Sequence, residues 1–102
     1  MTNAAEHGVQ LTTNTPGTLG VSGVLSFDTA AAALRAIQAA LAENKVAQLD
    51  LAGVRYSDSA GLSCVLAVVA EAARRGHAVQ VIHMPAGMQV LAQVCEVDRL
   101  IG

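Results

Sequence analysis

The chain of 102 residues has few aromatic side chains: one phenylalanine, one tyrosine and no tryptophan. It therefore lacks the aromatic platform on which bases or sugars stack. Charged residues make up only 14% of the sequence, and the formal net charge is −2. Without an excess of positive charge, a chain does not collect the phosphate contacts that dominate nucleic-acid affinity, so no nucleic-acid partner is expected. The apolar fraction of 53% is too high for a disordered chain.

Targeting and membrane signals are also missing. Residues 1–8 are small and polar, without the basic start and apolar run of a secretory signal. We interpret them as a flexible segment that precedes a single domain over residues 9–102. The longest stretch of low charge, residues 60–70, is about half as long as a membrane crossing requires. These features predict a cytoplasmic protein that does not insert into a membrane directly.

Cysteine and histidine are sparse and scattered. Cys64 and Cys95 lie far apart, and each is flanked by apolar residues. They leave two alternatives open, a disulfide or buried free thiols in a reducing compartment, and the sequence favours the second. His7, His77 and His83 share no metal-ligand spacing with one another or with a cysteine. We therefore expect no metal site and no other cofactor.

Hydrophobic periodicity predicts a series of strands and helices. Residues 9–13 and 18–23 alternate apolar and polar side chains, and the turn sequence between them indicates a β-hairpin. The order then continues as helix, strand, helix, strand and helix, over residues 27–44, 46–51, 59–75, 78–83 and 85–97. Residues 52–58 are expected to form a loop. Helical crossovers make the strands they join parallel, which predicts an α/β fold with a mixed sheet.

The loop before the second helix lies at the C-terminal edge of the parallel strands, where α/β domains place their sites. Ser57, Asp58 and Ser59 are each suited to cap that helix. Gly61 lies in the first helical turn, where alanine is the better helix former, and this suggests the close approach of another backbone. A phosphate on Ser59 would be stabilised by the helix dipole and opposed by Asp58. These residues alone are fully explained by a structural role, namely that they start the helix.

Residues 49–62 read LDLAGVRYSDSAGL and resemble the hallmark of STAS domains, a family named for sulphate transporters and anti-sigma factor antagonists. In that family, a strand reading D-L/F-S/A-x-V precedes D-S/T-x-G-L at the start of a helix. The residue after the second aspartate is the regulatory serine or threonine, and it corresponds to Ser59. The resemblance covers nearly the whole chain. It implies a single STAS domain with an N-terminal hairpin, a mixed four- to five-stranded sheet and three or more packed helices.

Residues 83–100 are similar to the ending of one branch of the family, the MlaB-like branch. That branch supplies the small cytoplasmic subunit of a phospholipid ABC transporter that maintains outer-membrane lipid asymmetry. The resemblance implies a non-enzymatic accessory subunit that binds an MlaF-like ATPase subunit, and through it the permease, peripheral to the inner membrane. By the resemblance, the helix of the motif carries the partner contact. Arg55 and Tyr56 are added as anchors beside it, because Arg and Tyr often dominate interface energies. The predicted partner residues are Arg55, Tyr56, Ser57, Asp58, Ser59, Ala60, Gly61 and Leu62.

Two further readings remain open beside the MlaB-like one. In the antagonist branch, a serine kinase phosphorylates the residue that corresponds to Ser59 and thereby breaks a complex with an anti-sigma factor. A STAS module that senses a ligand or acts only as a scaffold is the third reading. An enzyme is not expected, because the chain has no nucleophile elbow and no evident oxyanion donors.

In the last helix, Val90, Val94 and Val97 lie opposite a stripe that includes Met88. A helix that is apolar on both sides is either packed deeply on both sides or contacts a partner with its outer side.

Overall fold

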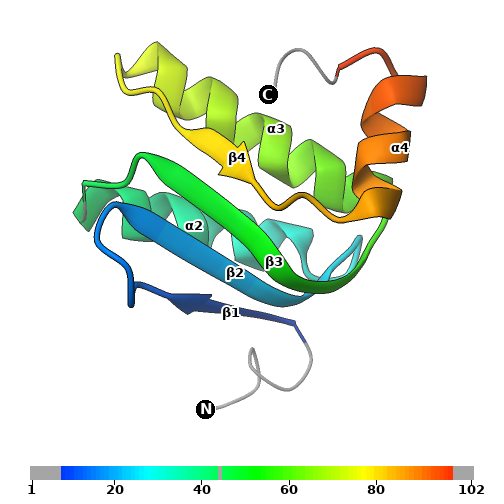
Figure 1. The fold of residues 1–102 in the computed structure, drawn as a ribbon, viewed down its shortest axis with the longest axis horizontal. Helices are drawn as coiled ribbons and strands as arrows, with labels where there is room; N and C mark the ends of the chain where they lie inside the picture. The colour runs from blue at the N-terminus through cyan, green and yellow to red at the C-terminus, as the bar shows by residue number, and fades with distance from the viewer. Residues whose placement is uncertain (1–7, 44, 98–102) are drawn as a thin grey trace.

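The computed structural model describes residues 8–43 and 45–97 and shows a four-stranded sheet with the order β1-β2-β3-β4 (Figure 1). β1 (Val9–Thr12) and β2 (Thr18–Leu25) are antiparallel and form the expected hairpin. β3 (Gln48–Ser57) runs parallel to β2, and β4 (Gln80–Ile82) runs parallel to β3. The predicted mixed α/β architecture is therefore confirmed.

Three helices occur in the described part of the chain: α2 (Ala30–Glu43), α3 (Ser59–Arg74) and α4 (Ala86–Val94). Figure 1 shows α2 and α3 side by side behind the sheet, with α4 near one end of α3. Alternate residues of β2 and β3 face these helices and are buried. The largest fully buried side chains are Leu19, Val21, Leu25, Ile37, Leu49, Leu51, Val65, Val68 and Met88. The core is thus aliphatic, as the scarcity of aromatic residues requires.

β3 is longer than the sequence predicted. The expectation of a strand over 46–51 followed by a loop over 52–58 is wrong for residues 52–57, which continue the strand. The second half of β3 pairs with the second half of β2, from Ser22↔Gly53 to Leu25↔Ser57, and this pairing satisfies its backbone groups. The register shifts twice, between Gly20 and Ser22 and between Gly23 and Val24 of β2, and each shift leaves one extra residue in β3, which breaks the alternation by which a strand is recognised. Residues 52–57 of the motif therefore belong to β3 and do not form a loop.

The ends of the helices also differ in places from the expectation. α2 begins at Ala30 instead of residue 27, because residues 26–29 form a separate hydrogen-bonded turn. α4 ends at Val94, earlier than expected. Asn44, the proposed end of the first helix, lies outside the described residues, as do residues 1–7 of the proposed flexible segment and residues 98–102. α3 agrees with its predicted bounds to within one residue.

The outer face of α4 is exposed in the part of the chain that the structure describes. Met88 and Ala92 are buried against the core, whereas Val90 and Val94 on the other side are 57% and 74% exposed. The prediction that both sides of this helix are deeply packed is therefore wrong. Cys95, just after α4, is exposed, which corrects the expectation that both thiols are buried.

No helix within residues 8–43 or 45–97 combines the length and the apolar character that a membrane span requires.

Candidate functional site

The N-terminus of α3 is capped by Asp58, which follows the last residue of β3. Asp58 has an extended backbone, and its Oδ1 accepts hydrogen bonds from the N–H groups of Ala60 (3.0 Å) and Gly61 (3.1 Å). A carboxylate at this position satisfies two donors that the helix itself leaves unpaired. Of the three candidate caps in the sequence, Asp58 is the one that caps the helix.

The second carboxylate oxygen of Asp58 reaches a different loop. Its Oδ2 accepts a hydrogen bond of 3.1 Å from the backbone N–H of Phe27, which lies 31 residues earlier, just after β2. This bond, together with those from Gly61 and Ala60, holds the pKa of the Asp58 carboxyl below its ordinary value of 3.8. Asp58 is therefore ionised at neutral pH, and it links the β2–α2 turn to the start of α3.

Gly61 brings α3 against the end of β2. Gly61 is buried, and a Cβ atom at this position would collide with the carbonyl oxygen of Leu25. The close backbone approach that the sequence suggested is confirmed. The two neighbouring strand ends and the first turn of α3 are therefore fixed relative to one another.

The turn after β2 is held by its own hydrogen bonds. The Thr29 hydroxyl accepts from the Ser26 N–H (2.9 Å) and donates to the Val24 carbonyl (2.8 Å). The Ser26 carbonyl in turn accepts from the N–H groups of Thr29 (3.0 Å) and Ala30 (2.7 Å). Phe27 projects from this turn with 81% of its side-chain surface exposed.

Sequence reasoning missed both the turn and Phe27. It placed Phe27 at the start of a helix, whereas Phe27 lies in a turn whose bonding side chain is that of Thr29. The sequence S-F-D-T could have indicated this turn, because Ser26 and Thr29 are three residues apart and hydroxyl side chains at this spacing often bond to the backbone.

The predicted partner residues fall into two groups. Arg55, Tyr56 and Ser59 are exposed, with Tyr56 at 58%, and within the described residues the Ser59 side chain makes no hydrogen bond. Ser57, Asp58 and Ala60 are half-buried, and Gly61 and Leu62 are buried. The motif thus supplies both an exposed surface and the packing that holds this surface in place.

The first aspartate of the motif has a separate role. Asp50 Oδ1 accepts the N–H of Ala52 (2.9 Å) and lies 3.0 Å from Nδ1 of His83, which has a left-handed backbone just after β4. The Ala52 N–H, followed by His83, lowers the pKa of Asp50 below its ordinary 3.8. This pair ties β3 to the end of β4 on the exposed face of the sheet.

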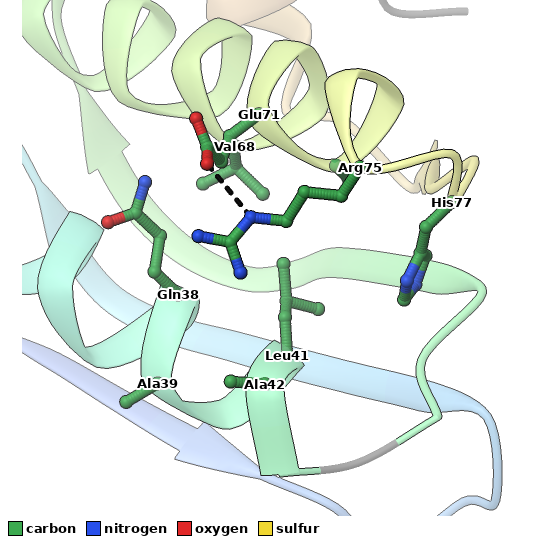
Figure 2. Close-up of a pocket in the computed structure, with 9 residues that line it drawn as sticks. Gln38, Ala39, Leu41, Ala42, Val68, Glu71, Arg75 and His77 are labelled. Atoms are coloured by element: carbon green, nitrogen blue, oxygen red, sulfur yellow. Dashed lines mark hydrogen bonds and ion pairs between the residues drawn. The ribbon is translucent and has the colours of Figure 1, made fainter.

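A groove of about 430 Å³ lies between α2 and the C-terminal half of α3 (Figure 2). In Figure 2, Arg75 extends between the two helices, and its Nε bonds to Glu71 at 2.9 Å. His77 at the end of the groove lies 2.8 Å, through Nε2, from the carbonyl oxygen of Val46. Because Arg75 and Asp58 belong to opposite ends of α3, this groove is separate from the motif surface.

Within the part of the chain that the structure describes, no three side chains of the metal-binding types come together as a metal site would require.

Comparisons with known proteins place the chain in a family. A family model described as "Mlab, STAS domain" matches residues 7–102. No curated protein matches the chain. Among solved structures, the phosphorylated form of the Bacillus cell fate determinant SpoIIAA has a TM-score of 0.65 and 18% identity, with 91% of this chain and 87% of that chain covered. The anti-sigma factor antagonist SpoIIAA in its unphosphorylated form has a TM-score of 0.62 and 19% identity, with 84% and 82% covered. These structures share the fold, and the chain itself belongs to the Mlab-type STAS-domain family.

Proposed function

We propose that this chain is a non-enzymatic accessory subunit that binds the ATPase subunit of an MlaB-type phospholipid ABC transporter. The observation that carries the proposal is the match of nearly the whole chain to the Mlab family model. The partner contact lies at the start of α3, where Arg55, Tyr56 and Ser59 are exposed on a rigid support. The complex keeps the chain at the cytoplasmic side of the inner membrane, and the permease is reached through the ATPase.

The electrostatics of the site favour a neutral Ser59. Asp58 already accepts the N–H groups of Ala60 and Gly61, which are the donors that an anion at this helix end would use. Its own charge would repel a phosphate on the neighbouring residue. The Ser59 hydroxyl is thus best suited to contact a protein surface directly, with Tyr56 and Arg55 as flanking anchors of the types that dominate interface energies.

Titration of the purified ATPase subunit with variants of this chain tests the proposal. Ser59→Glu is expected to raise the dissociation constant by at least about 10-fold, because an unpaired charge buried in an interface is costly. Ala70→Glu, on an exposed position of the same helix, is the matched control and should bind like the unmodified chain. Circular dichroism checks that both variants fold.

Two results would contradict the proposal. If the unmodified chain does not bind the ATPase, the accessory-subunit role is wrong. If Ser59→Glu binds as tightly as Ala70→Glu, the contact lies elsewhere on the domain.

The exposure of the Ser59 hydroxyl also favours a second candidate, an anti-sigma factor antagonist switched by a serine kinase. A kinase can reach this hydroxyl without unfolding the helix. This alternative predicts one phosphate on Ser59 when the cognate kinase and ATP are supplied, as measured by intact mass. It also predicts that an anti-sigma factor, rather than an ATPase of a transporter, is recovered with the tagged chain from its native cells.

A further inference from the structure

The two aromatic residues of the chain are both exposed, at the ends of neighbouring strands. Phe27 and Tyr56 are the only aromatic residues in the sequence, and their side chains are 81% and 58% exposed. Tyr56 is paired with Val24 near the end of β2, and Phe27 follows three residues after Val24. Burying an aromatic side chain removes a large apolar area from water, so aromatic residues are normally found in the core. Here the core is aliphatic, and the two aromatic residues lie at the C-terminal ends of β2 and β3, close in sequence to the turn before α2 and to the start of α3.

The exposed ring of Phe27 stands on a rigid turn. The Thr29 hydroxyl bridges Ser26 and Val24, and Ser26 receives two backbone hydrogen bonds. The backbone of Phe27 therefore needs little ordering when a partner binds. An anchor residue contributes most to affinity when its backbone is already ordered in the free protein, because binding then costs less conformational entropy.

Asp58 connects this turn to the motif. One of its oxygens caps α3 at Ala60 and Gly61, and the other holds the Phe27 N–H at 3.1 Å. The backbone of Phe27 is thus tied to the start of α3, where Ser59 is the first residue. A partner that contacts both residues meets them in one fixed arrangement.

We propose that Phe27 is the principal anchor of this surface for the ATPase subunit and inserts its ring into an apolar pocket of that partner. Asp58 is a positioning residue that holds the Phe27 turn in register with Ser59. Asp28, which is exposed and follows Phe27 in the sequence, and Asp58, whose carboxylate holds the Phe27 N–H, favour a partner pocket with a basic side chain at its rim. This inference rests on the proposed function, since it names the residue that dominates the same interface.

Binding of the ATPase subunit to three variants tests the anchor. Phe27→Ala is expected to raise the dissociation constant by about 30-fold or more, the loss that marks an interface hot spot. Tyr56→Ala is expected to have a smaller effect. Val94→Ala is the matched control, because Val94 is also a large exposed apolar residue, at 74%, and it lies at the end of α4. It should bind within about twofold of the unmodified chain, a change that lies inside the scatter expected for peripheral contacts.

A double-mutant cycle tests the positioning role of Asp58. Asp58→Asn retains an oxygen that caps the helix, but it places an NH2 group against the Phe27 N–H and so loses that bond. It is expected to weaken binding about 5- to 10-fold in the unmodified chain and hardly at all in Phe27→Ala. Equal losses in both backgrounds would show that Asp58 acts independently of Phe27, and the positioning role would be wrong.

The outcomes separate this inference from the proposed function. If the unmodified chain binds the ATPase and Phe27→Ala binds equally well, the anchor is refuted while the accessory-subunit role stands. If Val94→Ala weakens binding more than Phe27→Ala, the interface is centred on α4 and the anchor is likewise refuted. If the unmodified chain does not bind, the proposed function itself fails.

Discussion

Gly61 in the first turn of α3 lies directly against the carbonyl oxygen of Leu25, the last residue of β2. The approach leaves no space for a Cβ atom at Gly61. It fixes the start of the helix on the sheet, and with it the cap at Asp58 and the exposed Ser59. The glycine of the STAS motif therefore has a steric role in this chain, beneath the surface on which the proposed partner docks.

Replacing Gly61 with alanine is expected to lower the free energy of unfolding by about 1–3 kcal/mol, because the methyl group would push α3 away from Leu25. Urea denaturation followed by circular dichroism measures this loss. Gly87→Ala is the matched control, since Gly87 also lies in a helix but has open space around its Cβ position. That variant is expected to stabilise the protein by about 0.5 kcal/mol. Equal effects of the two substitutions would contradict the close approach.

The two thiols are expected to differ sharply in reactivity. Cys64 is buried, and burial raises the pKa of its thiol to about 11, so little thiolate forms at neutral pH. Cys95 is exposed. A maleimide reagent at neutral pH should therefore modify the native protein once, at Cys95, and should reach Cys64 only in denaturant. Peptide mass spectrometry identifies the site, and rapid labelling of Cys64 in the native protein would contradict its burial.

Much of the fold could be predicted from the sequence, because the apolar residues of most segments repeat with the period of either a strand or a helix. The aliphatic repeat of α3, bounded by Asp58 and Arg75, located that helix to within one residue. The second half of β3 could not be found in this way. Its pairing with β2 contains register shifts, and exposed residues such as Arg55 and Tyr56 give it the appearance of a loop.

The candidate site was predicted only in part, and for a related reason. The residues of the motif are contiguous, so Asp58 and Ser59 could be singled out together. Phe27 is brought to the same place by a hydrogen bond across 31 positions, and no local pattern reports such a contact. The pairing of Asp50 with His83 across two strands was missed for the same reason.

The stability of the protein should fall on acidification, in part because of Asp58. Its pKa in the folded state is below the ordinary value of 3.8, so the ionised carboxylate favours the folded state. This contribution is complete above the unfolded-state pKa and is lost as the pH falls through the folded-state value. Asp58→Asn should therefore be less stable than the unmodified chain at pH 7, and the difference should shrink towards pH 2. Urea midpoints across this range measure it, and a difference that does not depend on pH would show that the charge of Asp58 contributes nothing.

The attachment of α4 to the domain depends on the few side chains that it buries. Met88 is fully buried, whereas Val90, two residues later on the same helix, is 57% exposed. Met88→Ala leaves a cavity between α4 and the core and is expected to lower the free energy of unfolding by about 2–5 kcal/mol. Val90→Ala removes only exposed surface and should change it by less than about 0.5 kcal/mol. Urea denaturation compares the two variants. A loss below about 1 kcal/mol for Met88→Ala would mean that α4 contributes little to the folded state, because even modest cavities in a well-packed core cost more than this.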